Sequence, residues 1–141
     1  MEDAEPMVHG AVDDIQRARR IAHGIRKRAL ELTIKQDGCY LSQALSSAEI
    51  FAALYTCVLN IGPSLAPMKP GPFSGVPAPG KHDLGADYNG PRTEEYDRLL
   101  LSAAHYAVAV YAALVEVGRM DPEALFEFNQ DGSSVEMIGA E

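Results

Sequence analysis

The sequence lacks the features that define several common classes of protein. It has no tryptophan, and its two cysteines, Cys39 and Cys57, are not in a C-x-x-C pair, which argues against a zinc site. Its 12 basic residues are outnumbered by 20 acidic ones, for a net charge of −8, which argues against a general nucleic-acid binder. The apolar stretch 50–59 is far too short to span a bilayer. With no signal peptide or long apolar run, we expect a soluble cytoplasmic protein without a membrane or nucleic-acid partner.

The chain has enough length and apolar content for a single domain. Its 141 residues, 47% of them hydrophobic, suffice to bury a core. The basic residues gather in one early segment, which we interpret as a solvated helix face rather than an anion-binding face, with His23 solvated among them. They are Arg17, Arg19, Arg20, Arg26, Lys27 and Arg28.

A first helix is predicted from the spacing of apolar residues after the N-terminus. Residues 1–9 are acidic and unpatterned, so a disordered tail is expected there. From Val12 to Leu32 the apolar residues recur every three or four positions, which predicts an amphipathic helix. Gly38 is expected to end this helix in a left-handed conformation.

A second helix is predicted over 46–61. Ser46 and Glu49 have the spacing of a capping box, and Gly62 and Pro63 are expected to end the helix. Its predicted buried stripe comprises Ile50, Leu54, Cys57, Val58 and Ile61.

The second half of the chain predicts a long loop, a strand and two further helices. Residues 62–91 hold seven prolines and six glycines, a composition typical of a functional or partner-contacting loop. The apolar run 99–101 predicts a buried strand, and an enclosed helix follows from about His105. Asp121 is the expected N-cap of a last short helix. The predicted fold class is therefore α/β and mostly helical.

Three stretches in this order resemble the front part of transketolases, and more closely the separate N-terminal subunits of transketolase-like enzymes. "DGCYLSQALSSAEIFAALY" is similar to the family segment S-G-H-P-G-G-S-L-S-x-A-[DE]-I-x-x-x-L-Y. "YDRLLLSAAHYAVAVYAAL" is similar to D-R-[FV]-x-L-S-x-G-H-x-x-x-x-L-Y-A, and "LFEFNQDGSSVEMIGAE" to the segment before G-H-P-E. The resemblance implies that residues 1–141 form the N-terminal part of a thiamine diphosphate-binding domain.

The departures from the family pattern bear on the substrate and on partners. Tyr40 stands at the histidine of G-H-P-G, Ala104 precedes the second histidine, and the histidine of G-H-P-E has no counterpart. These losses imply a different or altered substrate. The sequence also has no G-D-G motif, which in the family holds the diphosphate and Mg²⁺, so the metal ligands are expected on a partner chain.

Four residues are candidates for the site that the resemblance implies. His105 is the candidate catalytic and cofactor-binding residue, because it matches the histidine of L-S-x-G-H; the alternative is a structural histidine bonded to a backbone carbonyl. Tyr40 is a candidate catalytic and substrate-contacting residue, or it packs against a partner chain. Gln43 and Ser42 are further substrate candidates, and no metal ligand is assigned in this chain.

The resemblance implies one subunit of a split enzyme that transfers a two-carbon ketol or acyl unit from a small ketose or 2-oxo acid through thiamine diphosphate with Mg²⁺. Such a chain is active only with transketolase-like partner subunits that carry the G-D-G motif and the pyrimidine-binding domain. The alternative is a non-catalytic scaffold subunit derived from a transketolase fragment.

Overall fold

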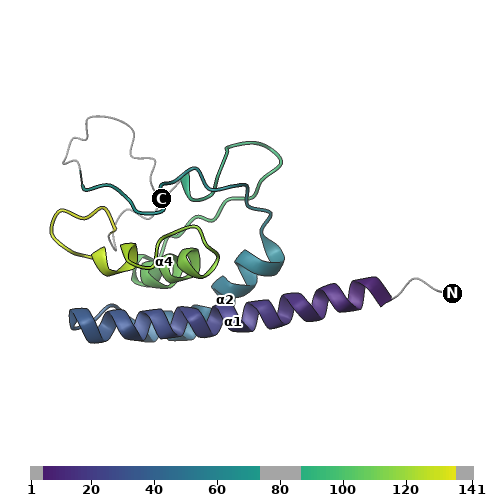
Figure 1. The fold of residues 1–141 in the computed structure, drawn as a ribbon, viewed down its shortest axis with the longest axis horizontal. Helices are drawn as coiled ribbons and strands as arrows, with labels where there is room; N and C mark the ends of the chain where they lie inside the picture. Colours follow the sequence, from purple (N-terminus) through teal and green to yellow (C-terminus); the bar gives the residue numbers. More distant parts are fainter. Residues whose placement is uncertain (1–4, 74–86, 136–141) are drawn as a thin grey trace.

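Three helices form the core of the protein in the computed structural model, which describes residues 5–73 and 87–135 (Figure 1). Helix α1 is Glu5–Gln36, helix α2 is Leu41–Ala53 and helix α4 is Ala107–Glu116. Each contacts the other two, with α1 and α2 side by side and α4 lying across them. Three short elements complete the described structure: a π-helical turn η1 at Leu54–Val58, and 3-10 helices η2 at Ala104–Tyr106 and η3 at Ala124–Glu127.

Small side chains at the contacts bring the three helices close together. Ile25, Ala29 and Leu32 of α1 are fully buried, as are Ala44 and Ala48 of α2. Helix α4 is buried nearly all round, so the prediction of an enclosed helix after His105 is confirmed. Its buried residues are Ala107, Val108, Ala109, Val110, Ala112, Ala113, Leu114 and Val115.

The predicted first helix is confirmed, but it is longer at both ends. It begins at Glu5, so the expected disordered tail is helical from that residue onward, while residues 1–4 lie outside the described structure. Val12 and Ile15, predicted on the buried face, are 49% and 51% exposed. The buried face begins only near Ala18, because no described element covers the helix before that point.

The predicted start of the second helix is wrong by five residues. Helix α2 begins at Leu41, so Ser46 and Glu49 lie inside it and form no capping box. The Ser46 hydroxyl donates to the Gln43 carbonyl instead, and Glu49 pairs with Arg26 of α1. The predicted stripe is also misplaced, because Ile50 and Val58 are 61% and 63% exposed, whereas Phe51 is buried.

Residues 99–101 form no strand, and no β-strand occurs in 5–73 or 87–135. Leu100 is 78% exposed, contrary to the predicted buried run, while Leu99 and Leu101 pack on the core. The side chain of buried Asn89 takes the place of a partner strand at Leu99: its Oδ1 accepts from the Leu99 amide at 2.7 Å and its Nδ2 donates to the Leu99 carbonyl at 3.0 Å. The α/β class therefore stays a prediction for this chain.

The described parts of the Pro/Gly-rich segment are irregular and are tied to the helical core. Residues 62–73 contain one isolated bridge, from Pro72 to Ser133. Arg119, just after α4, donates to the carbonyls of Ile61, Gly62 and Tyr88, and so fastens both ends of the segment. No helix in the described residues is long and apolar enough to cross a membrane.

Candidate functional site

The turn between α1 and α2 has an unusual backbone, which turns Tyr40 outward. Asp37, Gly38 and Tyr40 all have positive φ angles, of 57°, 132° and 57°. Gly38 is left-handed, as predicted. A left-handed conformation is costly for a residue with a bulky side chain, so surrounding contacts must hold Tyr40 in place.

Cys39 anchors this turn to α1. Its side chain is buried, and its thiol lies 3.4 Å from the Ala29 carbonyl and 2.9 Å from the Thr33 hydroxyl. Burial raises the pKa of the Cys39 thiol, an effect that the Thr33 hydroxyl partly opposes. The thiol therefore stays protonated at neutral pH and donates to the Ala29 carbonyl.

The structure brings together Tyr40 and His105, two residues 65 positions apart. Their rings pack edge to face, with centroids 4.7 Å apart and an interplanar angle of 86°. Tyr40 is 42% exposed, and His105 is exposed as well. Both roles of this histidine, in a cofactor site or as a structural residue, stay predictions.

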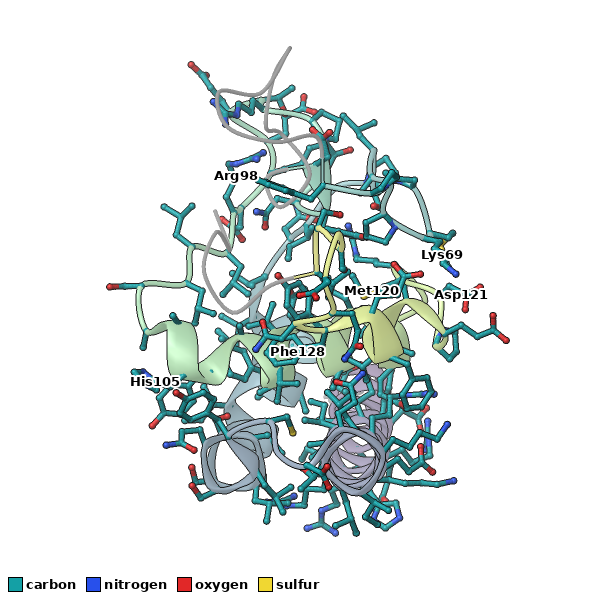
Figure 2. All side chains as sticks on the ribbon, turned by 90° about the vertical axis from the view of Figure 1, so that its left-hand side faces the viewer. Lys69, Arg98, His105, Met120, Asp121 and Phe128 are labelled. Atoms are coloured by element: carbon teal, nitrogen blue, oxygen red, sulfur yellow. The ribbon has the colours of Figure 1, made fainter. Side chains whose placement is uncertain are left out.

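His105 lies in η2, which leads directly into the N-terminus of α4 (Figure 2). The first turn of α4 holds no acidic residue, so no carboxylate there neutralises the positive end of the helix dipole, although the Ala107 amide already donates to the Ala104 carbonyl of η2. A histidine at this position has two uses. It can hold an anionic group beside the helix, and its ring nitrogens can donate or accept a hydrogen bond.

Gln43 and Ser42 lie in the first turn of α2, next to Tyr40. The Ser42 hydroxyl donates to the Gln43 side-chain oxygen at 2.8 Å, and the Gln43 carbonyl accepts from the Ser47 hydroxyl at 2.7 Å. Whether either residue contacts a substrate stays a prediction.

A groove in the described structure lies apart from these residues. It has a volume of about 720 Å³ and lies between the end of α1, η3 and Lys69, on the opposite side of the molecule from His105 (Figure 2). Its walls carry charges of both signs: Lys69 pairs with Glu127 at 2.9 Å, and Lys35 lies 3.7 Å above the Phe126 ring. None of the four predicted site residues lines it.

Sequence reasoning missed the residues that hold the turn, Cys39 and Thr33. Thr33 follows the last apolar position of the predicted first helix and Cys39 follows Gly38, but nothing in one sequence shows that the chain after Gly38 folds back onto α1. No group of three or more His, Cys, Asp or Glu side chains in the described residues is arranged to hold a metal ion.

Comparison with known proteins gives a relative in the transketolase family. The chain is 31% identical over 124 residues to a protein of Sinorhizobium fredii (strain NBRC 101917 / NGR234) named as an uncharacterized transketolase family protein, y4mO. The match covers 88% of this chain and 34% of the relative, so the chain spans about a third of that protein's length. No family model matches the chain, and no solved structure matches it significantly.

Proposed function

We propose that this chain is the N-terminal subunit of a split transketolase-family enzyme, in which Tyr40 and His105 form one wall of a thiamine diphosphate-dependent site. The ring contact between these two residues carries the proposal. They come from two separate sequence motifs, 65 residues apart, and their rings are in contact. Similarity to a transketolase family protein over most of the chain supports the family assignment.

The residues of this chain could form part of such a site, although not all of it. His105, exposed beside the start of α4, can donate to a phosphate oxygen and can give or take a proton at a ring nitrogen. Tyr40 packs edge to face against the imidazole ring and can restrict its orientation, and its side chain, 42% exposed, can contact a substrate. When bound, thiamine diphosphate would supply the stabilised carbanion needed to transfer a two-carbon ketol or acyl unit.

Partner chains are required by this proposal. The sequence has no G-D-G motif, and no group of three or more His, Cys, Asp or Glu side chains in the described residues is arranged to hold a metal ion. Mg²⁺ and the diphosphate would therefore be held mainly by a partner subunit. A small ketose or 2-oxo acid is the substrate class that this chemistry takes, and cytoplasmic location stays an expectation.

The second candidate is a non-catalytic scaffold subunit, which the missing histidines favour. Of the three family histidines, only the one at His105 is present. A scaffold has no need for an exposed histidine braced by a tyrosine in a left-handed conformation. Genomic context separates the two candidates: an adjacent reading frame with the G-D-G motif supports the enzyme, and neighbours without any thiamine-type motif support the scaffold.

The direct test is co-expression with the adjacent reading frames, followed by calorimetric titration of thiamine diphosphate with Mg²⁺. We expect binding only by the assembled complex, weakened about tenfold or more by His105→Ala, because one charge-assisted contact of this kind is worth on the order of 1.5–3 kcal/mol. His23→Ala, which alters an exposed histidine on α1, is the matched control and should leave the affinity unchanged. Equal affinity for the wild type and His105→Ala would return His105 to a structural role, and no binding by any assembly would favour the scaffold.

A further inference from the structure

Residues 97–103 lead into η2 as an extended segment that has no neighbouring strand among the described residues. No turn or bend interrupts the segment, and Ala103 has extended backbone angles, φ −88° and ψ 91°. The side chains alternate as they do in a strand: Leu99 and Leu101 pack on the core, whereas Leu100 between them is 78% exposed. One face of the segment is therefore covered by this chain, and the other face is open.

The two edges of the segment also differ from each other. On one edge, the Asn89 side chain bonds to both the N–H and the C=O of Leu99, as a residue of a neighbouring strand would. Asn89 is itself buried, so this edge is closed at Leu99. Successive residues of an extended chain turn their backbone groups to opposite edges, which places those of Leu100 and Ser102 on the other edge.

The edge that carries Leu100 and Ser102 is unpaired. The backbone N–H and C=O groups of these two residues make no hydrogen bond to any other described residue. Both residues are exposed, so another polypeptide can reach this edge. A row of free backbone donors and acceptors is complementary to the backbone of a second extended segment. The unpaired groups thus specify the conformation of the occupant, which an exposed apolar side chain alone would not do.

We propose that a partner subunit adds a β-strand to this open edge, bonds to the backbone of Leu100 and Ser102, and covers the Leu100 side chain with apolar residues of its own. The match covers 34% of the transketolase-family relative, so most of that protein's length is available in a partner to supply the strand. The inference rests on the proposed function only for the presence of a partner subunit. It holds for the enzyme and for the scaffold alike.

A second copy of this chain fits the open edge less well than a different partner does. Antiparallel pairing of two copies about a two-fold axis leaves both Leu100 side chains on the same face of the pair. No described residue covers that face, as the exposure of Leu100 shows. A partner that has an apolar layer beside its strand satisfies the backbone groups and covers Leu100 at once.

Amide hydrogen exchange, followed by NMR, tests the pairing in the full chain, alone and in complex with the product of the adjacent reading frame. In the chain alone, the Leu100 and Ser102 amides should exchange fast, and the Leu99 amide should exchange slowly because Asn89 accepts its hydrogen bond. In the complex, exchange at Leu100 and Ser102 should slow by about a hundredfold or more, because both amides are then bonded to the partner's strand.

Two pairs of variants separate backbone pairing from side-chain burial, with affinity measured by calorimetric titration of the separately purified subunits. Ser102→Pro removes a backbone N–H that Ser102→Ala retains, so only the proline variant should weaken the complex, by about tenfold. Leu100→Asp should also weaken the complex at least about tenfold, because it places a charge against apolar side chains. Ile34→Asp, at a 72% exposed site on α1, is the control and should not. Urea unfolding of each variant alone checks that it folds.

The outcomes separate this proposal from the proposed function. Slowed exchange at Leu100 and Ser102 in a complex that does not bind thiamine diphosphate supports the added strand and counts against the enzyme. A complex that binds thiamine diphosphate while both amides still exchange fast overturns the added strand and leaves the enzyme standing. Slowing that depends on the concentration of the chain alone assigns the edge to a second copy and overturns the proposal. No complex with any adjacent product overturns both.

Discussion

Cys39 and Tyr40 are neighbours in the sequence and have opposite environments. The Cys39 side chain is buried and bonded to α1, while Tyr40 is turned into solvent against His105. Within this short turn, Cys39 anchors the backbone to α1, and Tyr40 places its ring at the surface. This division explains how a non-glycine residue keeps a φ of 57° at Tyr40.

The two cysteines should react at very different rates with a thiol reagent. Burial shields Cys39 and raises its pKa, whereas Cys57 is exposed, so we predict fast labelling of Cys57 and slow labelling of Cys39 in the folded protein. Mass spectrometry of the labelled chain measures both rates, with Cys57→Ser as the control. Equal rates would contradict the anchored turn.

The raised pKa of Cys39 also predicts how stability depends on pH. The folded state holds the thiol proton more tightly than the unfolded state does. The resulting stability is fully present below the ordinary thiol pKa and is lost as the pH rises through the raised value. Urea unfolding at increasing alkaline pH should therefore show a larger loss of stability for the wild type than for Cys39→Ala.

The candidate site shows how far motifs can lead at the level of single residues. Tyr40 and His105 were both predicted from their motifs, and the structure places their rings in contact, while the role of each residue stays a prediction. The orientation of Tyr40 was not predictable, because it depends on the contacts of Cys39 with Ala29 and Thr33. Those contacts form only when the turn folds back on α1.

Among the elements, α1 and α4 were predicted well and α2 was not. Strong periodicity and an all-apolar composition defined the first two. The start of α2 was misplaced because Ser46 and Glu49 match a capping box equally well inside a helix, where Glu49 finds Arg26 instead. Burial of the Ala44, Ala48 and Phe51 side of α2 reflects packing on α1, which local sequence does not encode.

Gly24 lies at the contact between α1 and α4. The effect of Gly24→Ala on the free energy of unfolding should therefore depend on the residue at position 116 of α4. A Cβ at Gly24 would overlap the flexible carboxylate of Glu116, which pairs with Arg28. In a Glu116→Ala background, Gly24→Ala should stabilise the protein by about 1 kcal/mol through helix propensity alone. In the wild type we expect a smaller gain, because Glu116 must move away from Arg28.

The free energy of unfolding is measured in urea for the wild type, Gly24→Ala, Glu116→Ala and the double variant. Equal gains in both backgrounds would show that Glu116 and Gly24 are independent, contrary to the geometry.

At the scale of the whole molecule, Arg119 joins the irregular segment to the helical core. Its guanidinium donates to three carbonyls at the two ends of residues 62–91, and burial lowers its pKa from the usual arginine value. Arg119→Gln should lower the free energy of unfolding by about 2–3 kcal/mol, because charged hydrogen bonds are lost and buried carbonyls are left without donors.

The matched control for this change is Arg92→Gln. Arg92 is exposed, so its substitution should change the free energy of unfolding by less than about 0.5 kcal/mol. Similar effects of the two substitutions in urea unfolding would contradict the fastening role of Arg119.

Residues 99–101 were predicted as a buried strand, but they have no neighbouring strand in the described residues. An apolar run has the composition of a buried strand, but a strand needs a neighbour to pair with its backbone. In the described residues, Asn89 supplies that neighbour only at Leu99, and Leu100 stays exposed. If the proposed split enzyme forms, a partner chain would have to supply the strand that pairs with residues 99–101.

The central claim is that Tyr40 and His105 act as one unit in a cofactor site shared with partner chains. A double-mutant cycle in the assembled complex tests it most directly, with thiamine diphosphate affinity measured by calorimetry for the wild type, Tyr40→Ala, His105→Ala and the double variant. We predict that Tyr40→Ala weakens binding when His105 is present and has little further effect when it is absent, because Tyr40 acts by holding the imidazole. Independent effects of the two substitutions, or none from either, would contradict the claim.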